Sequence, residues 1–230
     1  MSNTIFKRVE EKYLLTENQK ERLLEEIKEY IEKDKYYEST ICNIYFDNLN
    51  HDLIINSLDK PFFKEKIRLR SYGVPTLKDD VYLEIKRKYN GIVSKRRVKM
   101  TLKEFYNYLN NQIFDHNNQI MKEIDYCFKY YNLIPTIYIA YDRISYKGKD
   151  CDLRITFDSN LRSRFDDLKL ELGDSLEKYF KENYYIMEIK TLGSIPLWLV
   201  KSLSKLNIYP TLFSKYGKIY EKRKELMYVK

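Results

Sequence analysis

The amino-acid sequence predicts an α+β fold in which eight mainly antiparallel strands form a closed or nearly closed β-barrel with helices packed outside it. Segments that alternate apolar and charged residues recur from one end of the 230-residue chain to the other, as expected for strands. Amphipathic helix patterns lie between these segments, and no repeat, low-complexity tract or Pro/Gly/Ser linker divides the chain. We therefore expect one domain that spans residues 1–230.

The predicted strands are short alternating runs rich in β-branched and aromatic residues. They lie at about 4–13, 40–47, 63–72, 81–89, 91–99, 136–147, 150–158 and 184–191. Two junctions have the composition of tight hairpin turns, namely Asn90-Gly91 and Lys147-Gly148-Lys149. The strands on either side of each junction are therefore predicted to pair antiparallel.

Five helices are predicted, each from a capping signal followed by apolar residues at helical spacing. The first begins at Thr16, which forms a capping box with Gln19, and reaches about Lys33 with Leu23, Leu24, Ile27 and Ile31 on one face. The others begin at Thr101 with Glu104, at Asn118 (to Tyr131), at Ser194 with Pro196 (to Leu206) and at Ser214 (to Tyr228).

Composition excludes several classes of function. Lys and Arg number 42 against 34 acidic residues, so the formal charge of +8 favours an anionic partner. With only two histidines there is no His-rich zinc site, and the six scattered glycines form neither common nucleotide-binding loop. The three cysteines are widely spaced, as is typical of reduced thiols. No apolar run approaches 18 residues, so we expect no membrane segment and a cytoplasmic protein.

One face of the predicted strands is dominated by Arg and Lys. In the run from Lys66 to Arg70 the cations share one side and Ile67 and Leu69 share the other. The same pattern recurs at Glu10 and Lys12, Glu84 and Lys86, Lys95 and Arg97, Arg143, Arg154 and Asp158, and Glu188 and Lys190. For a single strand, a solvated face is the usual explanation. Its recurrence on strand after strand favours a charged barrel interior, with the apolar faces covered by helices.

A barrel interior lined by cations would repel itself unless an anion neutralised it. A compact, highly charged phosphate ligand fits best, because Arg holds phosphoryl oxygens bidentately and Lys supplies point charges. The few acids on the same faces, chiefly Glu10, Glu84, Asp158 and Glu188, suit a hard divalent metal that bridges protein and phosphate. The alternation therefore indicates polyphosphate or triphosphate chemistry.

A series of short motifs resembles the triphosphate tunnel metalloenzymes of the CYTH-like superfamily, and among them the polyphosphate polymerase domain of the vacuolar transporter chaperone (VTC) family. The motifs follow the family's order over nearly the whole chain. They are Glu10-Glu11-Lys12-Tyr13, Ile44-Tyr45-Phe46-Asp47, Lys66 to Gly73, Leu83-Glu84-Ile85-Lys86, Ser94-Lys95-Arg96-Arg97, Arg143-Ile144-Ser145-Tyr146, Arg154 to Asp158, Met187-Glu188-Ile189-Lys190 and Phe213-Ser214-Lys215-Tyr216.

The resemblance implies an eight-stranded triphosphate tunnel that binds Mn²⁺ or Mg²⁺. By motif position it implies phosphate binding by Lys12, Arg68, Arg70, Lys86, Lys95, Arg143 and Lys215, with Arg97, Arg154 and Lys190 as further lining residues. Glu188 would hold the metal, together with Glu10. The groups closest to the reaction would be Arg68, Arg70, Lys86, Arg143 and Glu188.

One departure from the family pattern bears on activity. Many tunnel hydrolases begin with Glu-x-Glu-x-Lys, whereas this chain has Arg8 in place of the first acid. The substitution favours transfer of the ATP γ-phosphoryl group to a growing polyphosphate chain. Hydrolysis of tripolyphosphate or a nucleoside triphosphate is the alternative, and a non-catalytic polyphosphate-binding module is another. Nucleic-acid binding is disfavoured, because the cations alternate at strand spacing and form no helix stripe.

Overall fold

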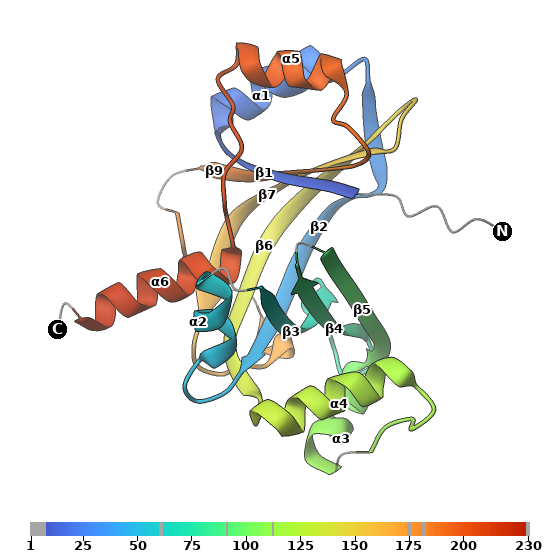
Figure 1. Ribbon diagram of the computed structural model, residues 1–230, viewed down its shortest axis with the longest axis vertical. Coiled ribbons are helices and arrows are strands. Elements are labelled where there is room, and N and C mark those ends of the chain that lie inside the picture. The colour runs from blue at the N-terminus through green and yellow to red at the C-terminus, as the bar shows by residue number, and fades with distance from the viewer. Residues whose placement is uncertain are drawn as a thin grey trace. The chain divides into compact units, whose positions relative to one another are not determined.

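The computed structural model describes residues 8–59, 62–90, 92–111, 113–173, 176–180 and 183–228, which form a nine-stranded antiparallel sheet and six α-helices (Figure 1). The strands are β1 (Arg8–Thr16), β2 (Ile31–Asp47), β3 (Phe63–Tyr72), β4 (Asp80–Tyr89), β5 (Ile92–Thr101), β6 (Ile134–Gly148), β7 (Leu153–Arg164), β8 (Glu177–Lys178) and β9 (Tyr184–Leu192). The helices are α1 (Glu17–Ile27), α2 (Asp52–Leu58), α3 (Leu102–Asn111), α4 (Gln119–Tyr131), α5 (Leu197–Lys205) and α6 (Lys215–Tyr228).

The order of the strands confirms an α+β fold on an antiparallel sheet but does not confirm a closed barrel. The strands are hydrogen-bonded in the order β1-β9-β7-β6-β2-β3-β4-β5, and β8 pairs with β7. In the described part of the chain β1 and β5 are the two ends of this order, so hydrogen bonds do not close the sheet. Closure into an eight-stranded barrel stays a prediction.

The chain divides into two compact units. Unit 1 consists of Met1–Thr40, Tyr141–Leu161 and Lys178–Ser214, and unit 2 of Ile41–Ala140, Arg162–Glu177 and Lys215–Lys230. Each unit has a hydrophobic core of its own. A single domain over residues 1–230 would require the two units to fold together, and this stays a prediction.

The core of unit 1 lies between the sheet and two helices. Helices α1 and α5 lie side by side (Figure 1) and cover the apolar face of β1, β7 and β9. The helices contribute Leu23, Ile27, Leu199 and Leu203, and the strands contribute Tyr13, Leu15, Ile155, Phe157, Met187 and Ile189. These strand positions are the alternate residues that the pattern assigns to the helix-covered face, so the alternation is confirmed here.

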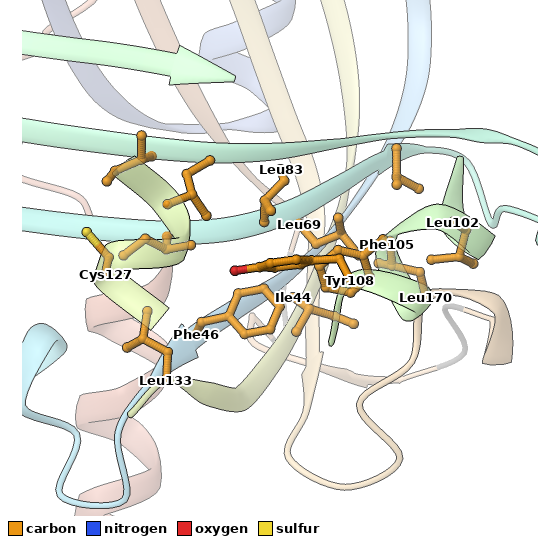
Figure 2. Close-up of a cluster of buried hydrophobic side chains, with 14 of the residues drawn as sticks. Ile44, Phe46, Leu69, Leu83, Leu102, Phe105, Tyr108, Cys127, Leu133 and Leu170 are labelled. Carbon is orange, nitrogen blue, oxygen red and sulfur yellow. The ribbon is translucent and has the colours of Figure 1, made fainter. Parts of the chain in front are cut away.

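The core of unit 2 lies between the apolar face of β3 and β4 and the helices α3 and α4. Figure 2 shows Leu69 and Leu83 next to Phe105 and Tyr108 of α3, with Cys127 of α4 at one side of the cluster. All five residues are buried. In both units the helices therefore cover the apolar face and leave most charged residues of the strands on the opposite face, with the ion pair of Arg87 and Glu65 in unit 2 as an exception.

Three helices begin where the sequence predicts, with a side-chain cap at each start. Thr16 and Gln19 form the reciprocal capping box of α1, and the Glu104 backbone N–H donates to Thr101 Oγ1 across 3.2 Å at the start of α3. Asn118 caps α4 by accepting from two backbone N–H groups of its first turn. No helix in the described segments is both long and apolar enough to cross a lipid bilayer.

The prediction that the first helix reaches about Lys33 is wrong. Helix α1 stops at Ile27, and Ile31 opens the long strand β2. Ile31 is still buried in the core of unit 1, at 5 % exposure, so its hydrophobicity is satisfied from a strand. Sheet pairing of the following tyrosine- and isoleucine-rich segment outweighs the helical spacing. The seven-residue helix α2 was not predicted, because it is too short for a periodic signal.

Candidate functional site

Three cations of unit 2 surround one buried carboxylate. Arg68, Arg70, Glu84 and Lys95, here called the arginine cluster, lie on the charged face of β3, β4 and β5. Glu84 is 1 % exposed and directly opposite Arg68 in the sheet. Arg68 Nε donates to Glu84 Oε2 across 2.8 Å, and Lys95 Nζ lies 3.2 Å from Glu84 Oε1. The register therefore brings together cations from neighbouring strands as predicted.

Charges within the arginine cluster perturb one another. Burial raises the pKa of Glu84, but the positive charges of Arg68, Arg70 and Lys95 outweigh burial and bring this pKa down to about 2. The pKa of Lys95 is lowered to about 8, mainly because burial removes water from its ammonium group. The positive charges of Arg68 and Arg70 also lower this pKa, whereas the negative charge of Glu84 opposes the shift. Since 42 % of the Lys95 side chain is exposed, water still reaches this ammonium group. The cluster is therefore a strongly anion-attracting surface.

Strand β2 holds both arginines in place. Asn43 and Tyr45 lie directly opposite Arg70 and Arg68 in the β2–β3 register. Arg70 Nε donates to Asn43 Oδ1 across 3.0 Å, and Arg68 donates to the Tyr45 hydroxyl across 3.1 Å. The sequence analysis assigned no role to Asn43. The available signal was its spacing of two residues from Tyr45, which places both on one strand face.

Other predicted phosphate ligands of unit 2 lie near the cluster or begin a helix. Lys86 is opposite both Lys66 and Lys95 in the sheet, and Arg97 is opposite Glu84. The Arg97 guanidinium also lies 4.8 Å from the centre of the Tyr82 ring. Lys215 is the first residue of α6 and is half-buried.

Unit 1 contains two carboxyl groups beside two lysines. Glu10, Lys12, Glu188 and Lys190, here called the paired-carboxylate cluster, lie on β1 and β9, where Glu10 is opposite Lys190 and Lys12 is opposite Glu188. Lys190 Nζ donates to Glu188 Oε2 across 2.8 Å. Lys12 Nζ donates to the carbonyl oxygen of Phe213 across 3.2 Å. Residues nearly the full length of the chain apart therefore meet in one cluster.

The two carboxyl groups of this cluster interact directly. Burial opposes ionisation of Glu188, but a hydrogen bond with Glu10 and the charges of Lys190 and Lys12 hold the pKa of Glu188 well below its usual range. Two carboxyl groups on neighbouring strands also offer oxygen ligands to a hard divalent cation. No group of three or more His, Cys, Asp and Glu side chains able to hold a metal occurs among the described residues. The pair fits Mg²⁺ or Mn²⁺, because such ions often bind one or two carboxylates and take their other ligands from phosphate and water.

The remaining predicted residues of unit 1 are held by ion pairs. Arg143 makes a bidentate contact with the buried Asp158, with nitrogen–oxygen distances of 2.6 and 2.8 Å. Arg154 is opposite Lys190 in the sheet and pairs with Asp34 at 3.1 Å, while 49 % of its side chain is exposed. Arg154 is therefore the most solvated of these cations.

These ion pairs correct one part of the sequence analysis. The cations were expected to repel one another strongly without a bound anion. In the structure Glu84, Asp158 and Glu188 each accept contacts from neighbouring cations, so the chain itself supplies part of the neutralising charge. An incoming phosphate group therefore competes with carboxylates as well as with water.

This molecule is therefore an α+β protein whose sheet carries, on the faces opposite the hydrophobic core of each unit, rows of Arg and Lys balanced by single buried carboxylates. The family model of the VTC domain matches residues 7–223, and the chain belongs to this family. No curated protein matches it.

Solved structures share the fold at low sequence identity. An adenylate cyclase candidate from Bacillus halodurans is 13% identical, with a TM-score of 0.55 over 90% of this chain and 93% of that one. A proposed adenylyl cyclase from Hippeastrum, described as having a dominant triphosphatase activity, is 14% identical, with a TM-score of 0.55 over 94% and 96% of the two chains. At these identities the similarity shows the fold alone.

Proposed function

We propose that this chain is a metal-dependent polyphosphate polymerase, which transfers the γ-phosphoryl group of ATP to a growing inorganic polyphosphate chain. Membership of the VTC domain family supports this proposal. The observation that carries it is the arginine cluster, in which Arg68, Arg70 and Lys95 converge around one buried carboxylate. A dense set of fixed cations is what a triphosphate or polyphosphate chain requires.

The phosphate contacts are assigned to cations on the charged strand faces and at the start of α6. Those of unit 2 are Arg68, Arg70, Lys86, Lys95, Arg97 and Lys215, and those of unit 1 are Lys12, Arg143, Arg154 and Lys190. Arg68 and Arg143 are each held by a carboxylate, so their forks are oriented before substrate binds. Pre-oriented donors lower the reorganisation needed in the transition state.

Glu188 and Glu10 are assigned to Mg²⁺ or Mn²⁺. When bound, such an ion supplies positive charge that stabilises the oxygens of the transferring phosphoryl group. Lys12 and Lys190 flank the two carboxyl groups and keep Glu188 ionised. The side chains otherwise bind and orient phosphate, since phosphoryl transfer depends mainly on positioning and charge stabilisation.

Hydrolysis of tripolyphosphate or a nucleoside triphosphate is the second candidate, because the similar fold from Hippeastrum is described as a triphosphatase. The same residues would then bind the substrate, and water would replace the polyphosphate acceptor. A binding module without catalysis is the third.

Product analysis separates these candidates. The protein is incubated with ATP and either Mn²⁺ or Mg²⁺, and the phosphorus products are separated on gels and identified by ³¹P NMR. Long chains with internal phosphate resonances support the polymerase, and orthophosphate alone supports the hydrolase. Binding of triphosphate without consumption of ATP or tripolyphosphate supports the binding module and overturns both enzymatic functions.

A further inference from the structure

A buried carboxylate that the proposed function does not use lies at the end of β2. Asp47 is 0% exposed and closes the alternating series Asn43, Tyr45, Asp47 on one face of the strand. Its oxygens accept from the backbone N–H groups of Leu53 and Ile54, both at 2.9 Å. Burial raises the pKa of Asp47 above its ordinary value, and these backbone hydrogen bonds oppose that rise only in part.

Asp47 also binds a tyrosine at the start of α6. The Tyr216 hydroxyl donates to Asp47 Oδ2 across 3.3 Å and lies 3.1 Å from Thr136 Oγ1. Thr136 Oγ1 also lies 3.2 Å from the carbonyl oxygen of Tyr45, so its single hydroxyl proton is shared between that carbonyl oxygen and the Tyr216 hydroxyl oxygen. The rings of Tyr216 and Tyr45 are in contact, with centroids 4.8 Å apart. The four residues are between 0% and 8% exposed and form one connected network in unit 2.

This network leads to two of the proposed phosphate ligands. The Tyr45 hydroxyl accepts a hydrogen bond from Arg68, so the position of the Tyr45 ring influences where that guanidinium points. Lys215 precedes Tyr216 in the first turn of α6, so an anchored Tyr216 also fixes the start of the helix that carries Lys215. Arg68 and Lys215 come from distant parts of the sequence, and Tyr216 is linked to both.

We propose that Tyr216 is a positioning residue, whose hydroxyl, bound to Asp47 and Thr136, holds Tyr45 against Arg68 and fixes Lys215 for phosphate binding. This inference rests on the phosphate-binding roles proposed for Arg68 and Lys215. It does not depend on whether the chain makes or hydrolyses polyphosphate.

The variant Tyr216→Phe tests the inference with little risk to the fold. Phenylalanine keeps the ring contact with Tyr45, and Asp47 keeps its backbone donors from α2. We expect a loss of triphosphate affinity of roughly three- to tenfold, the size of a typical net hydrogen-bond contribution. The dissociation constant is measured by calorimetry without metal, well below the melting temperature of each variant.

A double-mutant cycle distinguishes positioning from a general loss of structure. Tyr216→Phe is introduced into a chain that already carries Tyr45→Phe and Lys215→Met. These two substitutions remove the link from Tyr216 to Arg68 through the Tyr45 hydroxyl and the link to the Lys215 ammonium group. If Tyr216 acts through these residues, its replacement has no further effect on affinity there. Tyr108→Phe is the matched control, because Tyr108 is 3% exposed and its hydroxyl bonds Asp125 in the hydrophobic core of the same unit. This control is expected to leave affinity unchanged.

The possible results separate the inference from the proposed function. If Tyr216→Phe weakens binding equally in both backgrounds, or not at all, while Lys215→Met weakens it, the positioning role alone is overturned. If neither Arg68→Ala nor Lys215→Met weakens binding, the phosphate roles fail and the inference fails with them. If binding follows the cycle but no phosphoryl transfer occurs, the inference is supported and the enzymatic function is overturned.

Discussion

In the arginine cluster of unit 2 three cations surround one buried carboxylate, whereas in the paired-carboxylate cluster of unit 1 two carboxyl groups lie beside two lysines. Both are built in the same way, from alternate residues of neighbouring antiparallel strands whose other face packs under helices. The two clusters differ only in which charges occupy equivalent strand positions.

Because their charges differ, we expect the two clusters to bind different ligands although both are built from alternate residues of neighbouring strands. A surplus of cations attracts an anion directly, and the Arg forks suit phosphoryl oxygens. Two adjacent carboxyl groups would attract a cation, and the neighbouring lysines would hold an anion beside it. The following predictions test whether the clusters are in fact divided between phosphate binding and metal binding.

The largest expected effect is that of Glu188→Gln on catalysis. Loss of one of the paired carboxylates should reduce phosphoryl transfer or hydrolysis by roughly 10²- to 10³-fold, since the metal would stabilise charge that develops in the transition state. Metal-free triphosphate affinity should change little. Rates are measured across a range of Mn²⁺ and Mg²⁺ concentrations, with Glu32→Gln, at an exposed ion pair with Lys147 in the same unit, as control. Full activity of Glu188→Gln at every metal concentration would contradict the metal assignment.

The second prediction concerns the stability supplied by Glu84. Because the folded-state pKa of Glu84 is lowered to about 2, its stabilising contribution is present above the unfolded value near 4.5 and is lost as pH falls through 2. Glu84→Gln should therefore lower the free energy of unfolding by about 3 kcal/mol at neutral pH, measured by urea denaturation. The difference should shrink as the pH is lowered toward 2.

Added triphosphate sharpens this test. Without Glu84 the three cations of the arginine cluster have lost their carboxylate, so an anion gains more by binding them. The rise in melting temperature caused by triphosphate should thus be larger for Glu84→Gln than for the wild type. An equal or smaller rise would show that Glu84 does not compete with phosphate.

Two arginines of unit 2 give the third prediction. Arg68→Ala should weaken triphosphate binding by about 30-fold, the loss of two charge-assisted hydrogen bonds. Arg87 is a matched control, because it lies on the opposite, helix-covered face and pairs with the buried Glu65 and with Glu123. Arg87→Ala should cost about 3 kcal/mol of stability and leave affinity unchanged. Equal losses of affinity in both variants would remove the distinction between the two faces.

The sequence was most informative where both faces of a strand have a clear preference. Strand β3 occupies the predicted 63–72, because its apolar residues alternate with cations along its length. The membership of both clusters follows from the same alternation together with the family resemblance. The end of α1 could not be predicted, since Ile31 satisfies the helical spacing and the strand equally well.

The supporting residues could not be assigned from the sequence. Asn43 becomes the partner of Arg70 only through the β2–β3 register, and an uncharged amide on a strand carries no signal of that role. The carboxyl pair of Glu10 and Glu188 joins strands from opposite ends of the chain. Such contacts depend on tertiary structure, whereas the alternation is a local property.

The smallest predicted effect is a pH dependence at Lys95. With its pKa lowered to about 8 beside Arg68, Arg70 and Glu84, Lys95 is charged below pH 8 and becomes neutral above it. Phosphate binds the charged form, so triphosphate affinity should fall as pH rises through 8, by about threefold between pH 7.5 and 8.5. Lys95→Arg keeps its charge throughout this range and should lack that fall, which also corrects for the titration of triphosphate itself. Parallel pH profiles for the two proteins would show that Lys95 stays charged across this range, and would contradict a pKa lowered by the surplus of cations that distinguishes the arginine cluster from the paired-carboxylate cluster.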